Sequence, residues 1–265
     1  MINTPFNYTG SKFKLLEQII PYFDYSKDTF VDLFTGGGSV YTNIVDKYNN
    51  VIANDIIKDL IDIHKELLNS NDIIDKVKDT VVSKEDKEGF LELRNDYNEN
   101  PEPYKLWSLM LCSTNNMMRF NKKFKYNQTF GKRTYNPNTE KKIIEFVNHV
   151  RKYKSKLTFR SEHFMNIKPT NSMVYIDPPY SNTEAGYNAY WNKDDDLLLY
   201  DYIKKIDDNN SFMVSGVGEH GGKKSRLIDM LIGDGYNFKI LKNDYQGVSR
   251  NKSKKQGDEL IIFNY

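Results

Sequence analysis

The sequence predicts an α/β fold, a mostly parallel and doubly wound sheet interrupted by a mostly helical inserted domain. Two patterns predict it. Short apolar runs, typical of buried strands, alternate with helical apolar spacing near the start of the chain and again after residue 139. Residues 57–138 carry helical spacing without that alternation. We therefore expect residues 1–56 and 139–265 to form one discontinuous domain around an insertion at 57–138.

A first βαβ unit is predicted between residues 30 and 55. The apolar run 30–34 ends in the turn Thr35-Gly36-Gly37-Gly38-Ser39, and a helical pattern follows as far as Tyr48. The short run 51–53 then stops at Asn54-Asp55. The order of strand, glycine turn, helix and strand is that of one βαβ unit.

The rest of the chain divides into helices followed by strands. Helical spacing runs from about residue 56 to 100, where Pro101 and Pro103 break it, and a further helical pattern covers 106–118. The basic and aromatic stretch 119–135 is typical of a loop or hairpin. A helix is expected near 140–153. Strand-like runs follow at residues 157–160, 173–176, 211–215, 238–241 and 260–263.

Length and composition exclude several classes of protein. The 265 residues are enough for one sizeable core with a smaller inserted domain. No run of about eighteen apolar residues and no signal peptide is found, so we expect a cytoplasmic protein without a membrane segment. The single cysteine, Cys112, excludes an internal disulfide and a cysteine-cluster metal site. The histidines show no metal-ligand spacing: His64, His149, His163 and His220.

Positive charge is concentrated in part of the chain. From Arg119 to Arg160 there are thirteen Lys or Arg residues against two acids, although the whole chain carries a net charge of only +2. A second basic cluster lies at residues 250–255. Such asymmetry favours a partner with a phosphate backbone. A solvated helix face in a lysine-rich chain explains the charge equally well.

The tetrapeptide Asp177-Pro178-Pro179-Tyr180 directly follows the strand predicted at 173–176. Neither proline has an N–H to donate, so the chain leaves the sheet at the carboxyl end of that strand, where open α/β sheets bind ligands. Asp177 and the Pro178 carbonyl can each accept one hydrogen of an exocyclic amine on a planar base, and Tyr180 can stack on the ring. A proline-rich strand exit with a packed tyrosine is the structural alternative.

The glycine turn after the first strand is a second candidate site. Glycines let the backbone approach a ligand closely at the start of a helix. Asp55 follows Gly36 by nineteen positions, about the separation at which an acid reaches ribose hydroxyls. The turn is neither the dinucleotide fingerprint nor a P-loop, because the third spaced glycine and the Gly-Lys-Ser/Thr sequence are missing. Together with Asp55 it favours a nucleoside-containing ligand over a plain structural turn.

A third motif, Tyr8-Thr9-Gly10-Ser11-Lys12, precedes a helical pattern at the N-terminus. Its residue types predict a turn followed by a helix start.

Taken in order, the N-terminal motif, the glycine turn, the basic insertion and Asp177–Tyr180 resemble the Dam family, adenine-N6 DNA methyltransferases of the D12 class with the alpha motif order. The resemblance covers nearly the whole chain, includes Phe130–Thr134, Glu219-His220 and Asp258-Glu259, and is closest to the Dam enzymes of T-even phages. It implies a Rossmann-like methyltransferase sheet that binds S-adenosylmethionine without a metal, and a target-recognition domain at 57–138. The implied partner is double-stranded DNA of a nucleoid or a phage, bound by a monomer or a dimer.

The resemblance also implies roles for single residues. Asp177, Pro178, Pro179 and Tyr180 form the catalytic pocket for a flipped adenine. Asp55 holds the ribose of the cofactor and Phe164 its adenine ring. The implied cofactor-binding set is Tyr8, Lys12, Phe34, Gly36, Gly37, Asp55, Phe164 and Asp177.

For DNA recognition, Asn116-Met117-Met118-Arg119 matches the base-reading stretch of the family. Arg119 would donate two hydrogen bonds to guanine O6 and N7, and Arg133 would read or anchor a second guanine or its phosphate. Tyr187 matches a tyrosine beside the catalytic loop. The implied DNA-binding set is Asn116, Met117, Arg119, Asn121, Thr129, Lys132, Arg133 and Tyr187.

The matching family members recognise GATC, and we expect GATC or a relaxed version of it. Three residues depart from the family. Thr114 stands where an aromatic often wedges into the gap left by the flipped base, and Thr129 replaces a proline near the recognised bases. Gly216 replaces an asparagine after a later strand. The first two bear on sequence preference rather than on the reaction.

We expect direct methyl transfer to a base rotated out of the duplex, without a covalent intermediate. Cytosine-C5 methylation needs a cysteine nucleophile, and Cys112 is expected to pack inside a helix. Methylation of RNA, methylation of cytosine N4 and a catalytically silent DNA-binding protein remain alternatives.

Overall fold

The computed structural model of the protein describes residues 1–180, 191–242 and 259–265. Seven strands form one sheet in the order β3-β2-β1-β4-β5-β9-β8. The pairs from β3 to β5 are parallel, and β9 runs antiparallel to both of its neighbours. The strands are β1 (Thr29–Asp32), β2 (Asn50–Asn54), β3 (Leu157–Arg160), β4 (Ser172–Ile176), β5 (Ser211–Val217), β8 (Asn237–Ile240) and β9 (Glu259–Phe263). This is the Rossmann-like sheet that the sequence predicts.

Each predicted strand is found within about two residues of its expected bounds, which confirms the pattern of short apolar runs. Strand β4 is buried at every residue. The pair β6 (Glu219–His220) and β7 (Lys223–Lys224) forms a separate two-stranded sheet that the sequence did not predict.

Alternate residues of the strands enter two cores, because successive side chains of a strand point to opposite faces. Phe30 of β1 and Met173 of β4 lie in one core with residues of α1 (Leu16–Ile19) and α2 (Ser39–Ile44). Val31 and Val174 lie in the other with residues of α8 (Lys193–Ile206) and α9 (Arg226–Gly233). The sheet is therefore covered on both faces, as doubly wound sheets require.

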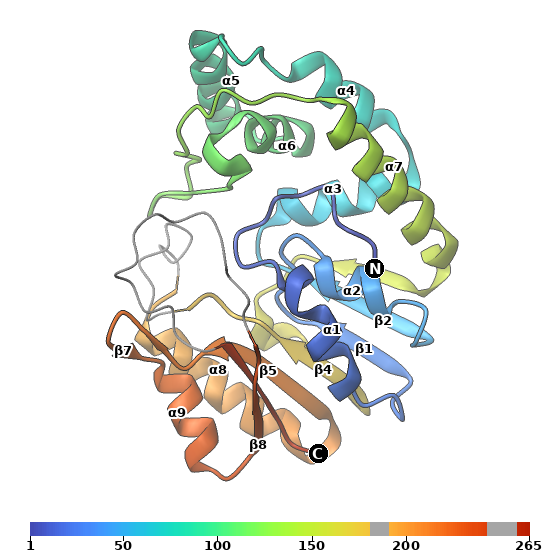
Figure 1. Ribbon diagram of the computed structural model, residues 1–265, viewed down its shortest axis with the longest axis vertical. Coiled ribbons are helices and arrows are strands. Elements are labelled where there is room, and N and C mark those ends of the chain that lie inside the picture. The colour runs from blue at the N-terminus through green and yellow to red at the C-terminus, as the bar shows by residue number, and fades with distance from the viewer. Residues whose placement is uncertain (181–190, 243–258) are drawn as a thin grey trace.

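Between β2 and β3 the chain is mostly helical. In Figure 1, α4, α5 and α6 gather in a second lobe, and α3 and α7 lie between them and the sheet. Helix α6 packs against α3, α4 and α5. How residues 57–138 divide from the rest as a recognition domain stays a prediction. The helices are α3 (Lys58–Asn69), α4 (Asp72–Thr80), α5 (Lys87–Glu99), α6 (Pro103–Cys112) and α7 (Pro137–Val150).

The helix predicted over 106–118 is wrong at its C-terminal end, because α6 stops at Cys112. Ser113 is extended, and Asn115 and Asn116 adopt φ values of 58° and 54°, a left-handed conformation that cannot continue an α-helix. The apolar spacing of Met117 and Met118 continued the helical pattern by coincidence.

The basic stretch after α6 is irregular, as predicted for a loop or hairpin. Isolated bridges join Ser113 to Phe130 and Phe120 to Tyr126. The buried Tyr126 hydroxyl lies 2.6 Å from the Ser113 hydroxyl and donates to the Met117 carbonyl at 3.1 Å. These contacts hold the stretch against α6 in a defined conformation.

No helix in the described ranges is long and apolar enough to cross a membrane.

Candidate active site

The chain changes direction across the sheet at β1, which has β2 on one side and β4 on the other. Such a switch point opens a crevice at the carboxyl ends of the strands. A cavity lies there, between the N-terminal segment, the glycine turn after β1, the end of β2 and the turn after β4. The residues predicted for catalysis and cofactor binding all line this one cavity: Tyr8, Lys12, Phe34, Gly36, Gly37, Asp55, Phe164, Asp177, Pro178, Pro179 and Tyr180.

Lys12 lies at the centre of the catalytic turn. The N-terminal motif forms the expected turn and helix start, since Ser11 caps the short 3-10 helix η1 (Lys12–Leu15). The Lys12 ammonium donates to Asp177 Oδ2 at 2.7 Å and to the Tyr180 hydroxyl at 2.9 Å. It also lies 3.2 Å from Glu259 Oε1, at the start of β9. The side chain of Lys12 is only 3% exposed, so these carboxylates are its main source of charge compensation.

Asp177 receives a further donor from the neighbouring strand. The Ser215 hydroxyl of β5 donates to Asp177 Oδ1 at 2.9 Å, and the Tyr180 hydroxyl donates to the same oxygen at 3.0 Å. Because the Ser215 hydrogen is used in this way, the Tyr175 hydroxyl, 2.8 Å away, donates to Ser215. Ser215 and Tyr175 are buried, so this chain fixes the orientation of the carboxylate.

The charges at this site stabilise one another. Burial by itself lowers the pKa of Lys12, but the carboxylates of Asp177 and Glu259 and the Tyr180 hydroxyl raise it well above its ordinary value. Burial and the Asp177 charge raise the pKa of Tyr180, which keeps its hydroxyl protonated. Lys12 is therefore a cation and Tyr180 a neutral hydroxyl at physiological pH.

Asp55 and the glycine turn are joined by hydrogen bonds. The Gly36 N–H donates to Asp55 Oδ2 at 2.9 Å, and the Ile57 N–H donates to Oδ1 at 3.0 Å. Gly36 has a φ of 50°, and a Cβ added there would lie 2.7 Å from the ring of Tyr8. The glycine is therefore required by its conformation and by the close approach of Tyr8. Each Asp55 oxygen keeps a lone pair for a hydroxyl in the cavity.

His64 of α3 supports the turn from below. Its Nε2 lies 3.1 Å from the Gly36 carbonyl, which can only accept, so Nε2 carries the hydrogen and Nδ1 accepts from the Tyr41 hydroxyl at 3.0 Å. Burial lowers the pKa of His64 to about 4, so the ring is neutral. These contacts make His64 a structural support of the glycine turn.

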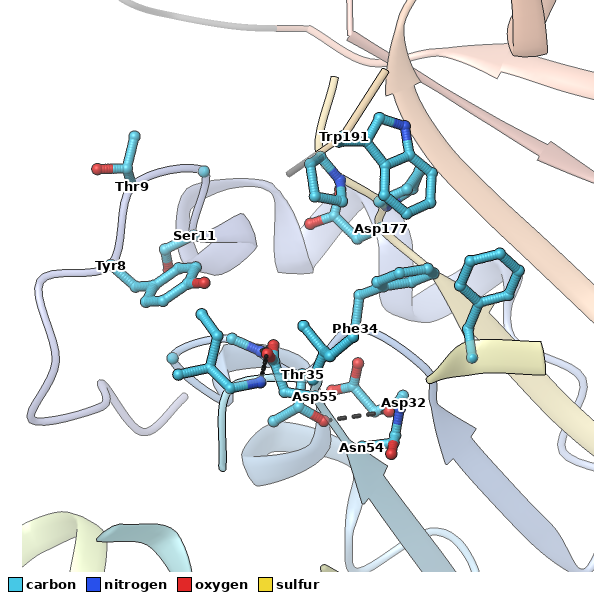
Figure 2. Close-up of a pocket in the computed structure, with 18 of the residues that line it drawn as sticks. Tyr8, Thr9, Ser11, Asp32, Phe34, Thr35, Asn54, Asp55, Asp177 and Trp191 are labelled. Carbon is cyan, nitrogen blue, oxygen red and sulfur yellow. Dashed lines mark hydrogen bonds between the residues drawn. The ribbon is translucent and has the colours of Figure 1, made fainter. Parts of the chain in front are cut away.

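Aromatic rings form one end of the cavity. Phe34 lies 5.7 Å from Phe164 and 5.6 Å from Trp191, measured between ring centroids, and the Trp191 indole donates to Asp196. Figure 2 shows Trp191 and Asp177 above Phe34, with Tyr8 and Ser11 on another side and Asp55 below. A planar ring can lie among the aromatic side chains while a hydroxylated group reaches Asp55. Trp191 was not predicted, because no regular spacing linked it to the other motifs.

Asp32 is a buried acid in the same cavity that the sequence reasoning missed. Its Oδ2 accepts the Tyr41 N–H at 3.2 Å. Burial raises the pKa of Asp32 to about 8, and the nearby Asp177 charge adds to the effect. An acid inside the apolar run 30–34 was the sequence signal that could have found it.

The described residues among those predicted to bind DNA do not line the active-site cavity, and several contact one another. Arg119, Thr129 and Lys132 are exposed, and Met117 is half-buried. Asn121 Oδ1 accepts the N–H groups of Lys123 and Lys125, so its side chain shapes a turn of the basic stretch.

Asn116 is buried, and both ends of its amide are engaged within the chain. Its Nδ2 donates to the Leu111 carbonyl at 2.8 Å, and its Oδ1 accepts from Arg133 at 2.7 Å. The side chain therefore orients Arg133. Its contact with DNA stays a prediction.

The three departures from the family have structural contexts. The hydroxyls of Thr114 and Thr129 lie 2.9 Å apart, so these two departures form one contact that joins the segment after α6 to the basic stretch. A Cβ at Gly216 would lie 2.9 Å from Ile228 Cδ1, so the glycine lets α9 pack closely on β5. Tyr187 and the basic cluster at residues 250–255 lie outside the described residues.

Cys112 is the buried last residue of α6, as expected, and burial raises the pKa of its thiol to about 11. It does not line the active-site cavity. Within residues 1–180, 191–242 and 259–265, no group of three or more His, Cys, Asp or Glu side chains could hold a metal ion. The described cavity is suited to binding a nucleoside and orienting an amine beside a carboxylate.

Comparison with known proteins agrees with this geometry. The family model described as D12 class N6 adenine-specific DNA methyltransferase matches residues 8–247. Modification methylase StsI of Streptococcus sanguinis is 30% identical over 100% of this chain and 43% of its own length. Type II methyltransferase M.FokI of Planomicrobium okeanokoites is 32% identical, with the same two coverages. The chain thus spans under half the length of these relatives.

A DNA adenine methylase of Haemophilus influenzae is 24% identical over 94% of this chain and 88% of its own length. Among solved structures, an rRNA methyltransferase of Streptomyces viridochromogenes covers 95% of this chain and 84% of its own, with a TM-score of 0.39 and 12% identity. A likeness at that level bears on neither fold nor substrate. A particular closeness to phage Dam enzymes stays a prediction.

Proposed function

The chain belongs to the D12 class of N6 adenine-specific DNA methyltransferases, and from this premise we propose that it methylates adenine N6 in double-stranded DNA with S-adenosylmethionine. One observation carries the proposal. The Asp177 carboxylate, at the end of β4, holds the ammonium of Lys12 at 2.7 Å, beside the ring of Tyr180. A site that binds one nitrogen with its hydrogens in this way suits an exocyclic amine.

The residues present fit S-adenosylmethionine. The aromatic rings of Phe34, Phe164 and Trp191 suit its adenine, and Asp55 suits its ribose hydroxyls. The negative charge of Asp177 favours a ligand with a cationic sulfur, and Asp32, which is mostly neutral at its raised pKa, adds a polar group to the wall. We assign Tyr8, Lys12, Gly36 and Gly37 to the remaining wall of this cofactor site.

The target adenine is proposed to leave the duplex and stack on Tyr180. Its unstacking costs a few kcal/mol, which the stacking and the new hydrogen bonds offset. In this position its amine replaces the Lys12 ammonium on Asp177, and the displaced ammonium keeps Glu259 as a partner 3.2 Å away. Ser215 then holds Asp177 in place to accept one amine hydrogen, and the Pro178 carbonyl accepts the other.

These two hydrogen bonds draw the nitrogen lone pair out of conjugation with the ring and aim it at the cofactor. When bound, S-adenosylmethionine would supply a methyl group on a cationic sulfur. The amine nitrogen takes this methyl group as its bond to sulfur breaks, which leaves the neutral thioether S-adenosylhomocysteine, and the surplus proton of the amine leaves to solvent. The chain contributes positioning and charge stabilisation, with no covalent intermediate. The buried Cys112 takes no part.

We assign recognition of the DNA sequence to the insertion at 57–138. Arg119 is exposed and would read one guanine, and Arg133 would read or anchor a second, held in its orientation by Asn116. GATC or a relaxed version of it is the proposed site. The relatives named as modification methylases suggest the same role here, beside a restriction enzyme. The protein would act on DNA as a monomer or a dimer in the cytoplasm.

The test is methyl transfer from labelled S-adenosylmethionine to unmethylated duplex DNA. The wild-type protein should label the DNA, and Asp177→Ala should lose turnover while calorimetry still detects binding of the cofactor, because Asp55 and the aromatic rings remain. Asp229→Ala, an exposed aspartate of α9, is the matched control and should remain active. Full activity of Asp177→Ala would refute the scheme. Label in RNA alone would support an RNA methyltransferase, and tight DNA binding without label would support a silent DNA-binding protein.

A further inference from the structure

A second cavity lies beside the active site, between the N-terminal segment 5–7 and helices α6 and α7. Three cations line it: Lys84, Arg133 and Lys142. Among the described residues that line this basic cavity there is no aspartate or glutamate. The positive potential of its walls is therefore not compensated from within, and such a concave basic surface concentrates anions.

Further hydrogen-bond donors face the same space. The cavity is lined by Asn136 and Thr139 at the N-terminus of α7, a helix of 14 residues whose dipole adds partial positive charge. Trp107, also in the wall, has a buried indole N–H that makes no hydrogen bond in the described structure. Buried donors of this kind usually have a partner in the functional state. The basic cavity is thus built from donors and cations, as a site for a polyanion would be.

The basic cavity adjoins the active site. Residues 8–12 line the active-site cavity and residues 5–7 line the basic cavity. Met118 and Asn116, two positions apart, likewise line the active-site cavity and the basic cavity, respectively. Its volume, about 500 Å³, is within the range of about 300–1,000 Å³ that is typical of sites for small molecules and so can admit a sugar-phosphate unit. A nucleotide in the active site would leave its neighbouring phosphates close to this opening.

We propose that the basic cavity binds the phosphodiester backbone of the DNA next to the target nucleotide, with Lys84 and Lys142 as phosphate-binding residues. The proposal rests on the proposed function, in that duplex DNA is the partner. It extends the contact with DNA beyond the stretch 116–133, to the segment before α5 and to the first turns of α7. Arg133 would link the two regions, because its guanidinium contacts Asn116 in the same wall.

The test is the salt dependence of DNA binding by Lys84→Gln/Lys142→Gln. Fluorescence anisotropy of a labelled 30-base-pair duplex, measured without cofactor between 50 and 200 mM NaCl, gives the slope of log affinity against log salt concentration. Each phosphate contact contributes about 0.9 to that slope. The double variant should therefore lose about 1.8 of the wild-type slope and bind at least about tenfold more weakly at 100 mM NaCl.

Lys152→Gln/Lys154→Gln is the matched control. These two exposed lysines follow the C-terminal end of α7, about 20 Å along its axis from Asn136, and their removal changes the net charge equally. The control should keep the wild-type slope. An unchanged slope in Lys84→Gln/Lys142→Gln, or equal losses in both double variants, would overturn the proposal.

The salt slopes and the methylation assay together separate this proposal from the proposed function. A selective loss of slope in a protein that fails to methylate adenine would leave the basic cavity as a DNA-binding site and refute the methyltransferase assignment. Methylation of adenine, together with equal salt slopes for the wild type and Lys84→Gln/Lys142→Gln, would support the proposed function and refute the basic cavity as a DNA-binding site. Binding of single-stranded RNA but not of duplex DNA would overturn both.

Discussion

Replacement of Ser215 by alanine tests the arrangement around Asp177 most sharply. The change removes the hydroxyl that donates to Asp177 Oδ1 at 2.9 Å and leaves the donors from Lys12 and Tyr180 in place. A hydrogen bond to a charged group contributes about 1.5–3 kcal/mol, and each 1.36 kcal/mol is about tenfold in rate. We predict that kcat falls about 10- to 100-fold without being abolished. The affinity for S-adenosylmethionine should change little, because Ser215 does not line the cavity.

The same substitution leaves the buried Tyr175 hydroxyl without its acceptor, at a cost of about 1–3 kcal/mol in the free energy of unfolding. Ser211→Ala is the matched control, because Ser211 lies on the same strand and its hydroxyl donates to Asp24, far from the site. Both variants should lose stability, measured by urea unfolding, but only Ser215→Ala should lose kcat in the labelling assay. Equal kcat values for the two variants would refute the positioning role of Ser215.

Three further outcomes are expected. Asp32 has a pKa of about 8 in the folded protein and about 4 in the unfolded chain, so between these pH values the folded state binds one more proton than the unfolded chain. The free energy of unfolding therefore falls as pH rises from about 4 to 8, by up to about 1.4 kcal/mol per pH unit. Urea unfolding at pH 5 and pH 7 should give a smaller difference for Asp32→Asn, which cannot titrate, than for the wild type, and equal differences would contradict the burial of this acid. Arg119→Ala should lose about 1–3 kcal/mol of discrimination between duplexes that differ at one G·C pair, measured as a ratio of kcat/KM values, whereas an unchanged ratio would remove Arg119 from base reading. Cys112→Ala should keep kcat within about twofold and lose about 1–3 kcal/mol of stability through the small cavity left in the core, and loss of turnover would restore a thiol to the mechanism.

Much of the sheet could be predicted because its strands are short apolar runs bounded by polar residues or by glycine and proline turns. The motif at residues 177–180 and the glycine turn both lie at carboxyl ends of strands, so the sequence alone predicts that they meet at one edge of the sheet. The structure brings Tyr8, Asp55 and Phe164 into the same cavity, as the family resemblance implies.

The contacts that complete the site could not be predicted, because they depend on strand register and on residues far apart in the chain. Lys12 and Asp177 are 165 positions apart, and Ser215 reaches Asp177 only because β5 pairs with β4 in one particular register. Glu259 meets Lys12 only because β9, the last strand, enters the sheet beside β5. No local pattern encodes these three contacts.

The prediction of the C-terminal end of α6 was wrong for a different reason. Left-handed conformations at Asn115 and Asn116 stop the helix, and hydrophobic spacing carries no information about them. The pairing of the Thr114 and Thr129 hydroxyls shows the same limit. Two departures from the family that look independent in the sequence prove to be one contact between the segment after α6 and the basic stretch.

The central claim is that this chain methylates the N6 amine of adenine in DNA. The most direct test is to incubate the purified protein with S-adenosylmethionine and unmethylated duplex DNA, digest the product to nucleosides and identify the modified base by mass spectrometry. The account predicts N6-methyladenine from the wild-type protein and none from Asp177→Ala. N4-methylcytosine, or no modified base in DNA that the protein binds, would contradict it.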